Sequence, residues 1–441
     1  MARQTEELKR FLQVKPPAGP GDPGLSLFSG AGISDIGYEL AGFRFCVQVE
    51  LDAQRAAVGK GNFPGSSWLV KDAGEARRDV VREYIAKTDL RPALLAATPP
   101  CQGMSSSNPS RGKRKSGEAG QYEAKNALLL DVAPIALALQ PRLIVCENVR
   151  QVRTHMVTNG DHERRLLATL ADELPGYKLF DTSVNMADYG VPQIRHRALV
   201  VLVHRDEPCL AGLERQGRMP WPKQTHSRYP RAGRKRWVSI RRWFRAMAYP
   251  PLSSRTAEEA RDSHPLHFVP HYGTDRYLLV RDIPPHTGRS AYENSICPSC
   301  WYHPVPVGAA VCSACGEAMR NRPIVLDPSG ARLIKGFSSS YRRMRSDMPA
   351  PTVTTNSSHI GSDNKIHPWE HRVLSILECA DLQTVPRFFD WSAALEKGQA
   401  YLVRNLIGEA LPSYFTYLHG RILRRLLAGD DSVYGELAVS G

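Results

Sequence analysis

Short apolar runs alternate with helical stretches through the first half of the chain. The runs with the length and composition of buried strands are LSLF (25–28), FCVQVEL (45–51), PALLAATP (92–99), RLIVCEN (142–148) and ALVVLVH (198–204). Helices are predicted near Asp35–Ala41 and over residues 126–140. Strands that alternate with helices predict a doubly wound α/β sheet, in which functional residues gather at the carboxyl ends of the strands.

The pattern changes on either side of this region. Residues 1–24 are polar and then rich in Pro and Gly, so we expect a flexible leader. The alternation continues to about Pro222, and residues 25–222 are predicted to form the main domain. Residues 251–350 are irregular and rich in Pro, Ser and Arg, which indicates a second, smaller module.

Charge points to a polyanionic partner. The 58 Lys and Arg residues exceed the 44 Asp and Glu residues, which gives a formal net charge of +14. Residues 223–250 contain nine Lys or Arg and no acid, and their aromatic residues are Tyr229, Trp237, Trp243, Phe244 and Tyr249. A solvated basic face is the plainer interpretation, but the absence of acids favours a surface for phosphates and bases.

Targeting signals are not evident. The sequence has no apolar stretch long enough for a membrane span and no apolar signal-peptide core at its N-terminus. We therefore expect a cytoplasmic protein without a membrane partner. In a reducing compartment, its nine cysteines are not expected to form disulfides.

A turn of small residues follows the first predicted strand. FSGAGISDIG (28–37) places Gly30 and Gly32 between strand and helix, where the backbone can approach a ligand closely. The next strand ends in Glu50, where an acid commonly accepts hydrogen bonds from ribose hydroxyls. Asp72, in LVKDAGE, could contact the adenine of a bound nucleotide. Each feature taken singly is equally consistent with a solvated strand end.

Three further groups carry candidate chemistry. Cys101, in TPPCQG (98–103), follows two prolines at a strand end, so its sulfur lies on a rigid turn. A lone Cys is more often a buried structural residue. Glu147, in CENV (146–149), ends the next strand. Arg195 and Arg197, in QIRHR (193–197), enter another strand with a spacing that points them the same way.

These residues fit methyl transfer to carbon 5 of cytosine. That carbon becomes nucleophilic when a thiolate adds to carbon 6, and an acid at N3 and an arginine at O2 assist the addition. Cys101 would be the nucleophile and Glu147 would hold or protonate N3. Arg197 would contact O2, and Arg195 would support the site.

The ordered motifs resemble those of the cytosine-C5 DNA methyltransferases over about residues 25–425. They are FSGAGISDIG, VEL with Glu50, PPCQ, ENV, QIRHR, HRVLSILECADLQ and LIGEALP. The resemblance implies that residues 25–222 form a large Rossmann-like domain that binds S-adenosylmethionine. It implies a target-recognition domain over 223–371 and a segment, 372–441, that returns to the first domain. The implied substrate is double-stranded DNA with the target cytosine flipped out.

The same resemblance implies roles for individual residues. Gln102 joins the catalytic set beside Cys101, and residues 103–125 are expected to be a mobile catalytic loop. The implied cofactor-binding residues are Phe28, Gly30, Gly32, Glu50, Asp72, Pro100, Leu128, Glu409 and Ala410. Glu409 stands where the family usually has Asn, so at this position only backbone contacts are carried over. Tyr341, Arg342, Arg343 and Arg345, in a segment that closes the recognition domain, are candidates to reach phosphates or guanine edges.

Four cysteines form two CxxC pairs in the second module. Cys297 and Cys300 are separated by eleven residues from Cys312 and Cys315, a spacing that favours a tetrahedral zinc site. Four thiolates leave no open position, so a structural zinc ribbon over 297–315 is predicted. Four independent thiols are the alternative. The other cysteines, Cys46, Cys146, Cys209 and Cys379, are expected in strands or the core.

Two other functions remain open from the sequence. One is a tRNA cytosine-C5 methyltransferase, and the recognition module argues mildly against it. The other is a non-catalytic nucleic-acid-binding relative, which the complete set of Cys101, Glu147 and Arg197 argues against. A monomer is expected, because no heptad repeat is present. A separate restriction endonuclease is a candidate partner for a bacterial enzyme with a short recognition site, and the chain itself contains no evident nuclease motif.

Overall fold

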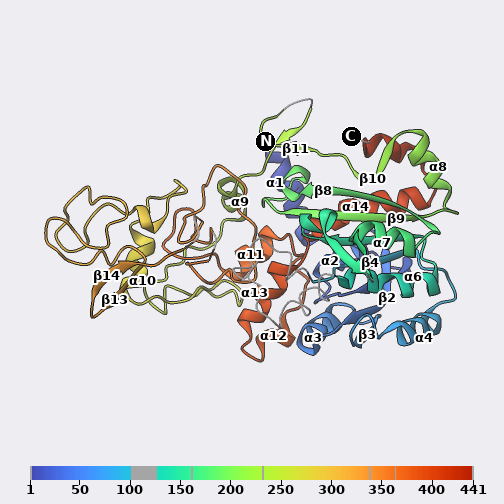
Figure 1. The fold of residues 1–441 in the computed structure, drawn as a ribbon, viewed down its shortest axis with the longest axis horizontal. Helices are drawn as coiled ribbons and strands as arrows, with labels where there is room; N and C mark the ends of the chain where they lie inside the picture. The colour runs from blue at the N-terminus through green and yellow to red at the C-terminus, as the bar shows by residue number, and fades with distance from the viewer. Residues whose placement is uncertain are drawn as a thin grey trace.

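The computed structural model describes residues 2–100, 127–159, 162–230, 233–336, 339–362 and 364–439. The molecule is elongated (Figure 1). A sheet flanked by helices forms one half, and a loop-rich module with few regular elements projects from it at the left of the view.

A seven-stranded sheet organises the first half of the chain. Its order is β3-β2-β1-β4-β5-β9-β8. In chain order, the strands are β1 (Asp22–Leu27), β2 (Phe43–Glu50), β3 (Ser67–Val70), β4 (Leu94–Ala97), β5 (Leu143–Asn148), β8 (Tyr177–Asn185) and β9 (His196–His204). The first five are parallel, whereas β9 runs antiparallel to both β5 and β8. The predicted doubly wound α/β sheet is confirmed.

Helices cover both faces of this sheet because alternate strand residues point to opposite sides. Leu94, Ala96 and Val145 join one core cluster, with residues of α2, α13 (Ala400–Glu409) and α14 (Ser413–Leu427). Leu95, Ala97 and Ile144 join the other, with residues of α4, α6 and α7. The helices of this half are α2 (Ile33–Leu40), α3 (Ala53–Asn62), α4 (Arg77–Lys87), α6 (Val132–Leu139), α7 (Leu166–Glu173) and α8 (Pro208–Arg215).

The N-terminal segment is ordered, and the expectation of a flexible leader over residues 1–24 was wrong. Ala2–Gln13 forms helix α1, and β1 begins within the expected leader, at Asp22. Leu8, Phe11 and Leu12 lie one helical turn apart and are at most 3% exposed. Phe11 packs edge-on against Tyr414, with ring centroids 5.1 Å apart. This apolar stripe binds the helix to the C-terminal part of the chain.

The projecting module has its own small core and few regular elements. Its described elements include α10 (Thr274–Arg281) and the antiparallel pair β13 (Ile324–Asp327) and β14 (Gly330–Leu333), whereas α9 (Ile240–Met247) contributes Ile240, Trp243 and Phe244 to the larger core cluster. Its core residues are Tyr272, Val280, Ile283, Ala291, Ile360, Ile366 and Val373. The shorter strands elsewhere are β6 (Met156–Asn159), β7 (His162–Arg165), β10 (Arg218–Pro222), β11 (His226–Ser227), β12 (Lys235–Arg236) and β15 (Leu437–Val439).

The last part of the chain returns to the sheet (Figure 1). Its helices are α11 (Ile376–Leu382), α12 (Ser392–Leu395), α13 (Ala400–Glu409) and α14 (Ser413–Leu427). The Ser413 hydroxyl donates to Ile33 O at 2.8 Å, and the Thr416 hydroxyl donates to Ser34 O at 2.8 Å, which fixes α14 against α2. Among the described helices, none is both long and apolar enough to cross a membrane.

Candidate functional site

The turn after β1 opens toward the carboxyl edge of the sheet. Phe28 and Gly30 both have φ 56°, in the left-handed region. Ser29 N donates to Val49 O at 2.9 Å, and the Thr98 hydroxyl donates to Phe28 O at 2.8 Å, so neighbouring strands hold the turn. A Cβ at Gly30 would meet no atom within 4 Å, whereas one at Gly32 would lie 2.2 Å from Phe63. Gly32 therefore permits tight packing beneath the turn, and Gly30 faces open space.

Glu50 joins this turn to the next helix. Its Oε2 accepts from Gly30 N at 2.8 Å, and its Oε1 accepts from Asp52 N at 2.9 Å. The side chain is buried, and its position at the end of β2 matches the expected ribose-binding acid. Each carboxylate oxygen keeps a further lone pair for a hydroxyl donor.

A pair of acids borders the same edge. Asp72 Oδ1 accepts from Gly74 N at 2.9 Å, and a Cβ at Gly74 would lie 3.2 Å from Asp131 Oδ1 and 3.3 Å from Asp72 Oδ1. Burial, reinforced by the Asp72 carboxylate, raises the pKa of Asp131 to about 6. Sequence analysis missed Asp131, although a lone acid in the apolar stretch NALLLDVAPIALALQ was a usable signal. Leu128 is half-buried on the turn before α6, and Pro100 is exposed.

Glu147 and Arg197 come together at the ends of β5 and β9. Arg197 Nε lies 2.7 Å from Glu147 Oε1, and Glu147 is 7% exposed. Burial raises the pKa of the Glu147 carboxyl above its ordinary value, while the charges of Arg197 and Arg195 oppose that shift. The Glu147 carboxyl is therefore held under two opposing influences, burial and the two guanidinium charges.

The turn that leads to Cys101 is tied to the same strand end. Asn148 Nδ2 donates to Pro99 O at 3.2 Å, and Asn148 is 5% exposed. Asn148 was not among the predicted site residues, although it stands in the quoted ENV motif. Cys101, Gln102 and the expected catalytic loop over 103–125 lie outside the described residues.

Arg195 contacts the backbone of segments that are distant in sequence. It lies just before β9 and is 0% exposed. Its Nη1 donates to Val353 O at 3.0 Å, and its Nη2 donates to Gly408 O at 2.9 Å and Glu409 O at 3.0 Å. Arg195 therefore joins the chain before β9 to Val353 and to the end of α13.

Glu409 ends α13 and faces α3. Arg55 donates from Nη1 to Glu409 Oε2 at 2.5 Å and from Nη2 to Glu409 Oε1 at 3.1 Å. The next residue, Ala410, accepts a hydrogen bond at its carbonyl from Gln383 Nε2. Leu411 N donates to the Ser34 hydroxyl at 3.0 Å. The C-terminal segment thus reaches both the helix after Glu50 and the helix after the glycine turn.

Arg343 is not available to a nucleic acid. It is 0% exposed, and its guanidinium donates to Ile283 O (3.0 Å), His367 O (2.6 Å), Glu370 O (2.6 Å) and Val280 O (2.7 Å). Its proposed contact with phosphates or guanine edges was therefore wrong. Arg345 remains half-exposed and pairs with Asp347 at 2.7 Å, and Arg342 Nη1 donates to Gly288 O at 2.5 Å.

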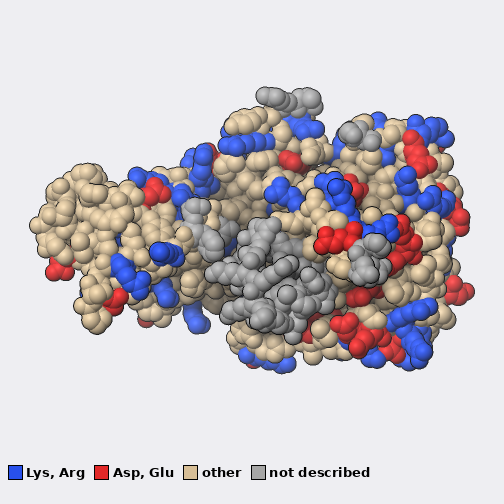
Figure 2. Space-filling view, in the orientation of Figure 1, with Lys and Arg blue, Asp and Glu red and all other residues tan. Residues whose placement is uncertain are grey.

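The aromatic residues of the basic segment 223–250 mostly serve the fold. Trp243 and Phe244 are buried in the core. Trp237 Nε1 donates to Asp188 Oδ1 at 2.8 Å, and the Tyr249 hydroxyl donates to Asp381 Oδ2 at 2.5 Å. Tyr229 alone among the five is exposed, with the Arg228 guanidinium 5.3 Å from its ring centroid. Lys and Arg side chains are nevertheless numerous across the middle of the visible face (Figure 2).

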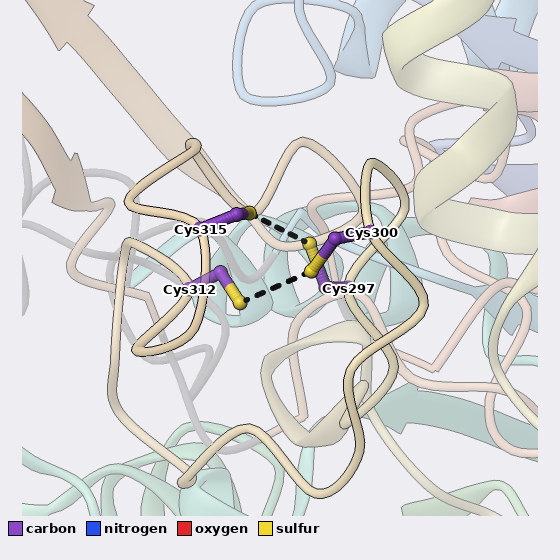
Figure 3. Close-up of side chains that lie close together, drawn as sticks. All are labelled: Cys297, Cys300, Cys312 and Cys315. Atoms are coloured by element: carbon purple, nitrogen blue, oxygen red, sulfur yellow. Dashed lines mark hydrogen bonds between the residues drawn. The ribbon is translucent and has the colours of Figure 1, made fainter.

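Four cysteine sulfurs converge in the projecting module (Figure 3). Cys297 Sγ lies 3.7 Å from Cys315 Sγ, and Cys300 Sγ lies 3.8 Å from Cys312 Sγ, while all four lie within 4.8 Å of one another. Edges of about 3.8 Å are what a tetrahedron of thiolates around zinc requires, since each Zn–S bond is about 2.3 Å. The four donors therefore fit a single tetrahedral metal ion.

A buried arginine supports this cluster. Arg322 is 1% exposed and donates to the carbonyls of Asn294 (2.7 Å), Val305 (3.0 Å), Pro306 (2.7 Å) and Ala309 (2.6 Å). It thereby fixes the chain between the two CxxC pairs. Asn321 Nδ2 donates to Asp282 Oδ2 at 2.8 Å and joins the cluster to the end of α10. Sequence analysis did not single out either residue.

Comparison with known proteins identifies the class to which this α/β fold belongs. Residues 24–417 match the family of C-5 cytosine-specific DNA methylases. The chain is 27% identical over 402 residues to the type II methyltransferase M1.HgaI of Avibacterium volantium, covering 88% of this chain and 94% of that relative. It is 32% identical over 200 residues to M.XorII of Xanthomonas oryzae pv. oryzae, covering 44% and 43%.

Two solved structures share the fold. A candidate DNA modification methyltransferase from an E. coli prophage has a TM-score of 0.53 at 18% identity, covering 92% of this chain and 99% of that one. The Entamoeba histolytica methyltransferase EhMeth has a TM-score of 0.51 at 12% identity, covering 93% and 99%. The chain belongs to the C-5 cytosine-specific DNA methylase family, whose methyl donor is S-adenosylmethionine.

Proposed function

We propose that this protein transfers a methyl group from S-adenosylmethionine to carbon 5 of a flipped-out cytosine in a short duplex DNA sequence. The buried Glu147–Arg197 pair, beside the Asn148-anchored turn that leads to Cys101, is the observation that carries the proposal. Cytosine presents an acceptor at N3 and another at O2, and a neutral acid and a guanidinium are their matching donors.

The chemistry assigns each group a step. The Cys101 thiolate forms a bond to carbon 6, and the displaced π electrons reach N3, where Glu147 supplies a proton or hydrogen bond. Arg197 donates to O2 and holds the ring. The cofactor supplies an electrophilic methyl group on sulfur. After carbon 5 has gained the methyl, loss of its proton and of the Cys101 sulfur restores the aromatic ring.

The residues of the glycine turn suit the cofactor. Glu50 retains acceptor capacity for ribose hydroxyls, and Gly30 leaves open space above the turn. Asp72, with the neighbouring Asp131, offers carboxylate oxygens to an adenine amino group. Phe28, Pro100, Leu128 and the backbone of Glu409 and Ala410 are the remaining proposed contacts.

A mechanism-based trap tests the proposal. Duplex DNA that carries 5-fluorocytosine at the methylated position should give a covalent protein–DNA adduct with wild-type enzyme and cofactor, because fluorine cannot leave carbon 5 as a proton does. Cys101→Ala should give none, and Cys46→Ser, a matched cysteine control outside the site, should retain it. If the wild type forms an adduct with RNA that carries 5-fluorocytosine but not with the DNA, its substrate is RNA. If Cys101→Ala still forms an adduct, Cys101 is not the nucleophile.

We also propose that residues 223–371 recognise the DNA sequence and that Cys297, Cys300, Cys312 and Cys315 hold one structural Zn²⁺ ion. Residues 295–316 contain no Lys, Arg, Asp or Glu, so this segment offers no Lys or Arg to DNA phosphates. The far left end of the projecting module also shows few charged side chains (Figure 2). The ion would therefore stabilise the module and take no part in methyl transfer.

Metal content tests the zinc proposal. Elemental analysis should find one zinc per chain in the wild type and in Cys46→Ser, and none in Cys297→Ser/Cys300→Ser. A wild type that folds and methylates DNA without zinc would contradict the proposal.

A further inference from the structure

The Arg55–Glu409 pair closes one corner of the proposed cofactor site. Asp52, which precedes α3, accepts from Gln54 N at 2.8 Å and from Arg55 N at 3.1 Å, so it caps the helix that carries Arg55. Asp52 N in turn donates to Glu50 Oε1 at 2.9 Å. A continuous series of contacts therefore runs from Gly30 through Glu50 and α3 to Glu409.

Glu409 is placed where a carboxylate needs a cation. It is the last residue of α13, where the helix dipole is negative. Burial raises the pKa of Glu409, and the carboxylates of Glu50 and Asp52 act in the same direction, whereas Arg55 opposes them. Three acids thus meet at this corner, and the two-pronged contact of Arg55 offsets their repulsion.

The backbone of Glu409 makes a second long-range contact, with Arg195. Gly408 O and Glu409 O both accept from Arg195 Nη2, at 2.9 and 3.0 Å. A Cβ at Gly408 would lie 2.4 Å from Thr354 C and Thr355 N, so this end of α13 is pressed against residues 354–355. Movement of the Glu409 side chain would therefore shift a turn that also supports Arg195.

We infer that Arg55 and Glu409 are positioning residues for S-adenosylmethionine binding, because their ion pair fixes the end of α13 against the helix that follows Glu50. This inference rests on the proposed function. The pair spans 354 positions of sequence, and it gives Glu409 a specific role where the resemblance implies Asn. Neither residue is assigned a contact with the reacting atoms.

Calorimetric titration with S-adenosylmethionine tests the inference without relying on turnover. Arg55→Met should raise the Kd about fivefold, because a partly exposed bidentate pair is lost and the carboxylates of Glu50, Asp52 and Glu409 are left without their cation. Arg55→Lys restores the charge with fewer bonds and should stay within about twofold of wild type. In a Glu409→Gln background, Arg55→Met should have less than about a twofold effect, because its partner is already neutral.

Arg82→Met is the matched control. Arg82 pairs with Asp79 at 3.0 Å on α4 and is 67% exposed, so its loss should leave the Kd unchanged. Equal Kd values for wild type and Arg55→Met would overturn the inference, as would the same fivefold loss in the Glu409→Gln background. A wild-type chain that does not bind S-adenosylmethionine would instead overturn the proposed function.

Discussion

Arg343 and Arg345 are two positions apart, and their substitution tests which arginines stabilise the proposed recognition module and which contact DNA. Arg343→Met removes a guanidinium that serves four buried carbonyl oxygens. If each carbonyl loses about 1 kcal/mol of net stabilisation, the protein should lose about 4 kcal/mol of unfolding free energy. Arg345→Met removes a 54% exposed side chain and should cost less than about 0.5 kcal/mol.

Urea unfolding followed by circular dichroism measures the free energy of unfolding of both variants. Binding to the cognate duplex at several salt concentrations measures how many phosphate contacts each variant keeps. Loss of a phosphate contact at Arg345 should reduce the slope of log K against log salt by about one unit. Under conditions in which both variants are folded, Arg343→Met should keep the wild-type slope of log K against log salt, because Arg343 is buried and contacts no phosphate. An Arg343→Met variant with wild-type stability and a reduced slope would refute the structural assignment.

Three further predictions concern the catalytic pair and buried charges. Glu147→Gln should lower the single-turnover methylation rate by about 100-fold to 10,000-fold while leaving the Kd for S-adenosylmethionine within about twofold; equal losses would make Glu147 structural. Burial lowers the pKa of His419 to about 4, so its stabilisation is present above an unfolded pKa of about 6.5 and is lost as pH falls toward 4. The stability gap between wild type and His419→Gln should therefore shrink by about 2 kcal/mol between pH 7.5 and 4.5, and a constant gap would contradict this. Arg372→Met leaves Glu378 unpaired in the core and should cost about 3–5 kcal/mol by urea unfolding, with partial recovery in Arg372→Met/Glu378→Leu; a small loss in the single variant would mean that Glu378 takes up a proton without cost.

The central strands could be predicted from sequence because both of their faces are buried. β4 and β5 are buried throughout and therefore consist of nearly continuous apolar residues. The strands missed by that criterion, β3 and β8, are the two edges of the sheet, and most of their residues are only partly buried. The leader was misjudged because its Pro and Gly content outweighed the helical spacing of Leu8, Phe11 and Leu12.

The candidate site also combines residues that could be predicted from the sequence with contacts that could not. Motif residues at strand ends, Glu50 and Glu147 among them, lie where the parallel sheet brings its carboxyl ends together. Long-range partners could not be predicted, because nothing near Glu409 in sequence indicates Arg55. Burial of charge was equally hidden: Arg343 and Arg345 are chemically identical in the sequence, and only the fold encloses one of them.

Bisulfite sequencing of DNA from cells that express the wild type or Cys101→Ala tests the central claim most directly. The account predicts that the wild type protects one cytosine within a recurring short sequence and that Cys101→Ala, expressed at the same level, protects none. Protection by Cys101→Ala, or its absence with a folded wild type that binds S-adenosylmethionine, would contradict methyl transfer to DNA through Cys101.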